Sequence, residues 1–227
     1  MAALLISGLA ACGRTQDNQS AVNLDDENAA AVEDSSEVNE NEETDTTASN
    51  VTPETESMAD DDEEQKDETD IMIVYFSRSG NTKFIAEMIQ EQTQGELFQI
   101  ETAVPYADDY DTVLDQAQQE QRENARPELS AYPENIEDKQ MIFIGYPIWW
   151  GDTPMAMLTF LENYDFTGKT VIPFCTHGGG GAGSSFSTVE NAVQGAEVLE
   201  GFSVSGSGAS GAEGDVADWL RRLNIIS

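Results

Sequence analysis

The chain has 227 residues, and its 44 Asp and Glu against 10 Lys and Arg give a formal net charge of −34. This acidic balance argues against nucleic acid as a partner, because phosphate binding needs an excess of basic side chains. With one histidine and two cysteines, the chain offers no cluster from which a zinc site or a catalytic triad could be built.

The first residues form a short apolar segment that ends at a cysteine. Residues 2–11 are apolar and rich in small side chains, and they lead into Cys12 through the sequence Leu-Ala-Ala-Cys. This run resembles a bacterial lipobox, in which a signal peptide is cut before a cysteine that then carries lipid. The segment is shorter than the about 20 residues that a membrane span needs, and it lacks the basic residues expected ahead of a signal segment. We expect residues 1–12 to be a signal peptide ending at a lipidated Cys12; an accidental apolar start with a stray cysteine is the alternative.

An acidic stretch follows the cysteine. Residues 1–69 hold 20 Asp and Glu against 2 Lys and Arg, a net charge of −18, and residues 70–227 carry the other −16. Beyond its first dozen positions this stretch has few large apolar residues, so it cannot bury enough surface to offset the entropy cost of ordering. We therefore expect a disordered acidic linker over 13–69 and one domain over 70–227, which is long enough to build a full core.

Within 70–227, apolar segments alternate with amphipathic ones. Strands are expected at 71–76, 96–101, 141–145, 170–174 and 197–203, and helices near 82–94, 108–125, 154–163, 184–194 and 213–224. The first, third and fourth strands are almost wholly apolar, as strands covered on both faces are, whereas the second alternates and suits an edge with one wet face. Thr153 before Pro154 predicts a helix cap. This alternation predicts a parallel, three-layer α/β sandwich.

The loop after the first strand has the composition of an anion site. It consists of Ser77, Arg78, Ser79, Gly80, Asn81 and Thr82. Hydroxyls and backbone N–H groups would meet there at the positive end of a helix dipole. The loop lacks the lysine of a P-loop and the glycine pattern of a dinucleotide site, so a single terminal phosphate is the better match. A Ser/Gly-rich turn without a ligand is the alternative.

Two further loops at the same edge carry unusual sequences. After the third strand come Pro147, Ile148, Trp149, Trp150 and Gly151, and after the fourth come Thr176, His177, Gly178 and Gly179 in a run that extends to Gly181. Neighbouring exposed indoles usually mark a binding site, and glycines let backbone amides approach a ligand closely. The alternatives are indoles that fold back into the core and a glycine run that serves as a flexible spacer.

The hexapeptide Ser-Arg-Ser-Gly-Asn-Thr after an apolar strand resembles the Ser/Thr-x-Ser/Thr-Gly-Asn-Thr phosphate loop of flavodoxins, and the other two loops stand at matching places. The resemblance covers 70–227 and implies a flavodoxin-like sandwich whose five-stranded parallel sheet has the order 2-1-3-4-5. It also implies FMN as cofactor, with the phosphate at Ser77–Thr82, one side of the ring against Pro147–Gly151 and another against Thr176–Gly179. The third loop departs from many flavodoxins, because it offers His177 and glycines where they place a tyrosine.

The resemblance implies an electron carrier, which the lipobox would hold outside the cytoplasmic membrane of a bacterium by its lipid anchor. Its partner would be a basic redox protein, with a membrane-bound reductase as one candidate, and docking would weaken with salt. An FMN-dependent NAD(P)H or quinone reductase is one alternative, with His177 suited to proton delivery. A histidine whose hydrogen bonds are satisfied within its own loop is the other interpretation of this residue. A flavin-free binding module is a second alternative to the carrier. We expect Cys175, at the end of an apolar strand, to be an inert buried thiol, and we assign no role to the long segment 102–139.

Overall fold

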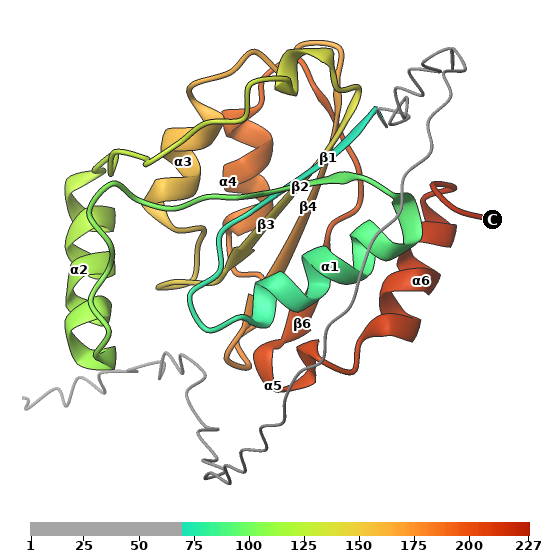
Figure 1. The fold of residues 1–227 in the computed structure, drawn as a ribbon. Coiled ribbons are helices and arrows are strands. Elements are labelled where there is room, and N and C mark those ends of the chain that lie inside the picture. The colour runs from blue at the N-terminus through green and yellow to red at the C-terminus, as the bar shows by residue number, and fades with distance from the viewer. Residues whose placement is uncertain (1–69) are drawn as a thin grey trace, which may run out of the picture.

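The computed structural model describes residues 70–227, and within them strands and helices alternate along the chain (Figure 1). Cys12 and the linker expected over 13–69 lie outside the described residues. The strands are β1 (Ile71–Tyr75), β2 (Glu96–Gln99), β3 (Met141–Pro147), β4 (Thr170–His177), β5 (Glu197–Val198) and β6 (Phe202–Ser205). The helices are α1 (Asn81–Thr93), α2 (Tyr110–Glu123), α3 (Met155–Leu161), α4 (Ser185–Ala192), α5 (Gly206–Ala209) and α6 (Glu213–Arg222), and a single 3-10 turn, η1, spans Ile136–Asp138.

All strands run parallel in one sheet with the order β2-β1-β3-β4-β5, while β6 also pairs with β4. This arrangement confirms the predicted α/β fold and strand order. Because the strands are parallel, their carboxyl ends meet at one edge, which is where open α/β sheets bind ligands. The three loops singled out in the sequence follow β1, β3 and β4 and therefore gather at this edge.

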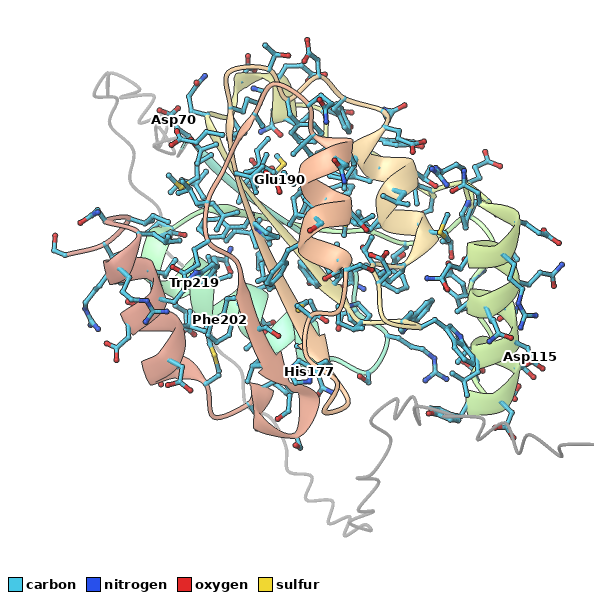
Figure 2. The ribbon with its side chains drawn as sticks, turned by 180° about the vertical axis from the view of Figure 1, so that it is seen from behind. Asp70, Asp115, His177, Glu190, Phe202 and Trp219 are labelled. Atoms are coloured by element: carbon cyan, nitrogen blue, oxygen red, sulfur yellow. The ribbon has the colours of Figure 1, made fainter. Side chains whose placement is uncertain are left out.

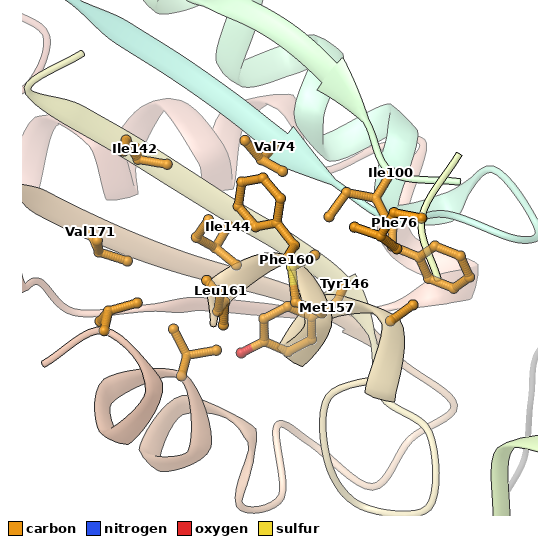
Figure 3. Packing of buried hydrophobic residues seen from close by; sticks show 14 of the residues in the cluster. Val74, Phe76, Ile100, Ile142, Ile144, Tyr146, Met157, Phe160, Leu161 and Val171 are labelled. Carbon is orange, nitrogen blue, oxygen red and sulfur yellow. The ribbon is translucent and has the colours of Figure 1, made fainter. Parts of the chain in front are cut away.

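Helices cover both faces of the sheet, as Figures 1 and 2 show from opposite sides. Helices α1, α5 and α6 pack on one face around Phe143 and Trp219. Helices α3 and α4 and the buried side of α2 pack on the other, around Ile144, Tyr146 and Phe160 (Figure 3). The central strands β1, β3 and β4 are almost completely buried, as their apolar sequences predict. In residues 70–227 no helix is long and apolar enough to cross a membrane.

The predicted fifth strand is divided into two short strands along β4. Between β5 and β6, the carbonyl oxygen of Glu200 accepts a hydrogen bond of 2.9 Å from Trp219 Nε1. At Gly201 a Cβ atom would come within 2.7 Å of the Phe186 ring, so a larger residue would need this ring to move. The break between β5 and β6 thus coincides with a carbonyl group that is hydrogen-bonded to the Trp219 indole and with a close approach of the Phe186 ring to the backbone.

Two local predictions are corrected. The edge strand β2 does not divide into one exposed and one buried face, because Phe98 packs against the core on one side and Leu97 on the other, while Glu96 and Gln99 at its ends are exposed. Helix α3 begins at Met155 with Pro154 as its N-cap residue, and no side chain caps it. Thr153 Oγ1 is buried and has no hydrogen-bond partner among the described residues, so the cap expected from this threonine does not form.

Candidate functional site

The loop after β1 ends at the N-terminus of α1, where backbone donors are available. Gly80 is the N-cap residue with φ +88°, a left-handed conformation that favours glycine. Ser77 Oγ accepts a hydrogen bond of 3.3 Å from the Lys83 amide. The Asn81 and Thr82 amides, in the first turn, have no intrahelical acceptor, and Ser79 is exposed. The loop therefore presents amides and a hydroxyl at a helix N-terminus, as anion binding requires.

A buried contact joins this loop to the end of β4. Thr82 Oγ1 lies 2.9 Å from Thr176 Oγ1, and the two residues are 1% and 3% exposed. The Thr82 hydroxyl thus has a protein partner, and the group that this residue offers to an anion is its amide. The contact links the first predicted loop to the third.

Arg78 points away from the α1 N-terminus and toward the segment that follows β2. Its Nη2 atom donates to the Asp108 carbonyl at 2.5 Å and to the Ala107 carbonyl at 3.4 Å. Next to this contact, the Asp109 carboxylate caps α2 by accepting a hydrogen bond of 2.9 Å from the Thr112 amide. That hydrogen bond lowers the pKa of Asp109, and the positive charge of Arg78 contributes to the shift. Arg78 therefore connects the first loop to the segment before α2.

The loop after β3 closes in a tight turn. The amides of Trp149 and Asp152 donate to each other's carbonyls at 2.9 and 3.1 Å. Between them, Trp150 and Gly151 have φ of +51° and +79°, the paired left-handed conformation of a type I′ turn. Such a conformation is unfavourable for a tryptophan, so surrounding contacts must hold it in place.

The Asp152 side chain supplies part of that support. Its Oδ1 atom accepts from the Thr153 amide at 2.7 Å. Its Oδ2 atom accepts from Ser184 Oγ at 2.8 Å and from Thr188 Oγ1 at 2.9 Å. Two of these donors belong to the start of α4, and the Ser184 amide also donates to the Gly151 carbonyl at 3.0 Å. Asp152, which the sequence analysis did not single out, therefore attaches the turn to α4.

The two tryptophans differ in their surroundings. Trp149 is 4% exposed and packs edge-on against Phe76 and Tyr106, with ring centroids 5.4 and 4.9 Å away. Trp150 is half-buried, and its Nε1 donates to the Leu114 carbonyl on α2 at 3.0 Å. The expectation of two outward-facing indoles is wrong for Trp149, which folds back onto the core because aromatic partners from two other segments surround it.

The loop after β4 begins within the sheet. β3 and β4 extend beyond their predicted ends, because Pro147 pairs with Thr176 in the ladder. His177, seen in Figure 2 at the carboxyl end of β4, is the last residue of this strand. Its Nδ1 atom accepts a hydrogen bond of 3.0 Å from the Gly179 amide, which assigns the proton of the neutral imidazole to Nε2. Gly179 has φ +109°, and nothing lies within 4 Å of the position of a Cβ atom there. Gly178 is half-buried.

Cys175 precedes this loop and is completely buried. Its Sγ atom contacts Ser203 Oγ at 3.5 Å, and burial raises the pKa of the thiol to about 11. The predicted burial of Cys175 is confirmed, and a thiol with a raised pKa carries little of the reactive thiolate. Within 70–227, no three His, Cys, Asp or Glu side chains gather into a group that could hold a metal ion.

The structure brings all three predicted loops together at one edge and adds a fourth segment to them. This segment, residues 103–109, follows β2 and contacts the first loop through Arg78 and the second through the Tyr106 ring. Pro105 and Tyr106 are the residues of this segment that could have drawn attention to it in the sequence. No local pattern, however, specifies which loops a lone aromatic residue will contact.

Comparison with known proteins agrees with this geometry. Residues 70–223 match the protein family described as flavodoxin. A solved structure of a candidate flavoprotein from Bacteroides eggerthii is 30% identical with a TM-score of 0.60, covering 68% of this chain and 97% of that chain. A flavoprotein from Lactobacillus acidophilus, solved in complex with FMN, is 27% identical with a TM-score of 0.52, covering 61% and 94%. No curated protein gives a significant match. Since the family match extends over nearly the whole described region, the chain belongs to the flavodoxin family.

Proposed function

We propose that residues 70–227 bind FMN at the carboxyl edge of the sheet and act as an electron carrier. The observation that carries this proposal is the lysine-free loop Ser77–Thr82, whose amides stand at the N-terminus of α1. The adjacent Lys83 is paired with Glu87 at 3.7 Å on the helix surface. A single phosphate held by amides and hydroxyls suits this donor set, and the FMN complex of the Lactobacillus acidophilus relative supports the same cofactor.

The remaining loops suit the ring of such a ligand. Residues 147–151 would line one side of it, and residues 176–179 another, where the open backbone around Gly179 allows close approach. FMN, when bound, supplies one-electron and two-electron redox chemistry. The protein's own groups bind the phosphate, orient the ring and exclude water from its buried side. His177 would present the N–H of Nε2, since Nδ1 is occupied by the Gly179 amide.

This same imidazole supports a second candidate function, an FMN-dependent NAD(P)H or quinone reductase. His177 is half-buried at the carboxyl end of β4, beside the place proposed for the ring, and a histidine is a common general acid or base in enzymes. Mixing NADPH with the flavin-loaded protein separates the two candidates. Rapid bleaching of the flavin absorbance supports a reductase, whereas a carrier stays oxidised until a redox protein is added.

The cellular location that we propose is extracytoplasmic, with lipidated Cys12 as the membrane anchor and 13–69 as a spacer. The Leu-Ala-Ala-Cys sequence and the acidic stretch after it support this proposal. A redox protein would deliver or accept the electrons. A membrane-bound reductase is one candidate, because it would lie in the same membrane as the lipid anchor. The acidic charge of the domain favours a basic docking surface on this partner.

The test of FMN binding is a titration of the full-length chain with FMN and with riboflavin, which lacks the phosphate. Replacing Ser79 by Ala removes a hydroxyl from the loop, and we expect FMN to weaken about tenfold, as for the loss of a hydrogen bond to a charged group. Riboflavin should be unaffected. Ser187→Ala, an exposed serine on α4, is the matched control. Equal weakening of both flavins would refute the phosphate assignment, and no binding of either flavin by the wild-type chain would refute the function.

A further inference from the structure

Three aromatic rings from different segments meet beside the candidate site. Phe76 follows β1, Tyr106 lies in the segment after β2, and Trp149 begins the turn after β3. Tyr106 packs edge-on against both others, with ring centroids 5.7 Å from Phe76 and 4.9 Å from Trp149 and interplanar angles of 69° and 89°. Edge-to-face contacts of this kind have a preferred geometry, so the Tyr106 ring restricts where the Trp149 indole can lie.

Tyr106 is itself held by α2. Its hydroxyl donates to Glu120 Oε2 at 2.8 Å, and the neighbouring Ala107 amide donates to Gln116 Oε1 at 3.1 Å. From the opposite side, Arg78 donates to the Ala107 and Asp108 carbonyls. The segment is therefore attached to α2 and to the first loop at once, and its tyrosine has little freedom to move.

The contact between Tyr106 and Glu120 is partly removed from water. Burial raises the pKa of Glu120, although the hydrogen bond from Tyr106 acts in the opposite direction. Burial and this hydrogen bond together also raise the pKa of the Tyr106 phenol, which keeps it a donor. A carboxylate acceptor makes a stronger hydrogen bond than a neutral one. The half-buried Glu120 carboxylate can therefore anchor the Tyr106 ring through its hydroxyl.

The turn that Trp149 begins needs support at both of its ends. Trp150 and Gly151, at its centre, are in the left-handed conformation, and a tryptophan adopts this conformation only where its neighbours enforce it. At one end the Asp152 carboxylate accepts hydrogen bonds from the hydroxyls of Ser184 and Thr188. At the other end the indole of Trp149 is held by the rings of Tyr106 and Phe76.

We propose that Tyr106, anchored by Glu120, is a positioning residue of the flavin site that acts through Trp149 on the turn 149–152. This inference rests on the proposed function. The Tyr106 ring acts on the side of the site that would face the flavin ring, whereas its segment contacts the phosphate loop through the backbone carbonyls of Ala107 and Asp108, which a change of the Tyr106 side chain keeps. Loss of the Tyr106 ring should therefore weaken flavins with and without a phosphate by the same factor. This pattern distinguishes Tyr106 from the residues of the first loop, whose loss should weaken FMN alone.

The experiment compares FMN and riboflavin binding by the full-length wild-type chain and its Tyr106→Leu and Tyr106→Phe variants. The leucine variant loses both ring contacts, and we expect both flavins to weaken about tenfold, with their affinity ratio unchanged. The phenylalanine variant keeps the ring contacts and loses only the hydrogen bond to Glu120, so both flavins should weaken by less than in the leucine variant. The matched control is Tyr132→Leu: Tyr132 is 38% exposed, lies in the same 102–139 segment and also packs edge-on against a ring, that of Tyr164.

The absorption spectrum of the bound flavin gives a second readout, because its visible bands report the surroundings of the ring. It should change in Tyr106→Leu and not in Tyr132→Leu. If Tyr106→Leu does not fold, Tyr106→Met, which fills more of the space, carries the same expectation. Wild-type affinity and spectrum in the leucine or methionine variant would overturn the inference, as would a loss confined to FMN. A wild-type chain that binds neither flavin would overturn the proposed function itself and the inference with it.

Discussion

Thr82 Oγ1 and Thr176 Oγ1 lie 2.9 Å apart in the buried layer beneath the site, although 94 positions separate these residues in the sequence. One threonine lies in the first turn of α1, and the other lies near the end of β4. Their hydrogen bond joins the loop proposed for the phosphate to the loop proposed for the ring. The distance between these two loops is thus set by the protein before any ligand arrives.

Replacing either threonine of this pair by valine should destabilise the domain. Each single variant leaves the other hydroxyl buried without a partner, at a cost of about 1–3 kcal/mol. The Thr82→Val/Thr176→Val double variant should cost less than the sum of the two, because neither hydroxyl is then stranded. Urea unfolding of the flavin-free full-length chain measures this cycle, with Ser187→Ala as the control. Strictly additive losses would show that the two hydroxyls do not interact.

Removing the Asp152 carboxylate should release the 149–152 turn from α4. Asp152→Ala removes the carboxylate that accepts from the hydroxyls of Ser184 and Thr188, and we expect a loss of about 2 kcal/mol, typical of hydrogen bonds to a charged group. Flavin affinity should fall as well, since the turn is expected to line the ring. Asp165→Ala removes a carboxylate that also accepts a backbone hydrogen bond, from the Thr167 amide, and serves as the control. A variant with wild-type affinity would show that the turn does not depend on this attachment.

Glu120 should make stability depend on pH in a direction opposite to that of most acids. Burial raises its pKa in the folded state, so folding takes up a proton, and its contribution to stability is lost as pH rises from about 4.5 through the raised value. The free energy of unfolding of wild type minus that of Glu120→Gln should therefore decrease over this interval and then level off. Glu123→Gln, which changes an exposed acid on the same helix, is the matched control. Parallel curves for wild type and Glu120→Gln would contradict the prediction.

Tryptophan fluorescence should report the flavin ring. At least one of Trp149 and Trp150 is expected to contact the ring, so FMN binding should strongly quench the emission of the chain. Trp219 packs in the core on the other face of the sheet, against Phe143 and Phe202 (Figure 2). A Trp219→Phe variant should therefore keep most of the quenching. If Trp149→Phe and Trp150→Phe both leave quenching and affinity unchanged, the ring does not lie against this turn.

The N-terminal cysteine provides the test of the proposed location. In a bacterial host, the full-length chain should incorporate labelled fatty acid and sediment with the membranes. The Cys12→Ser variant should lose both properties, because the residue that would carry the lipid is gone, while Cys175→Ser is the control with the other cysteine removed. Recovery of the wild-type protein in the soluble cytoplasm with an intact N-terminus would refute the anchor.

The local content of the sequence determined the fold and brought the three loops of the candidate site to one edge of the sheet. Continuous apolar runs such as 141–145 specify buried parallel strands, because both faces of such strands need apolar side chains. The glycine of the hexapeptide 77–82 indicates a tight turn before a helix, and Gly80 adopts the positive φ that such a turn needs. These features depend on neighbouring residues and can be read along the chain.

Tertiary structure decided where the long side chains of the site point. The Trp149 indole turned inward because rings from two other loops were there to receive it. Arg78, which a local motif assigned to a phosphate, reached backbone carbonyls about thirty positions away. The anchoring of Tyr106 by Glu120 likewise depends on how α2 packs on the sheet. Contacts between residues distant in sequence form only when whole elements pack, so a pattern within one segment cannot specify them.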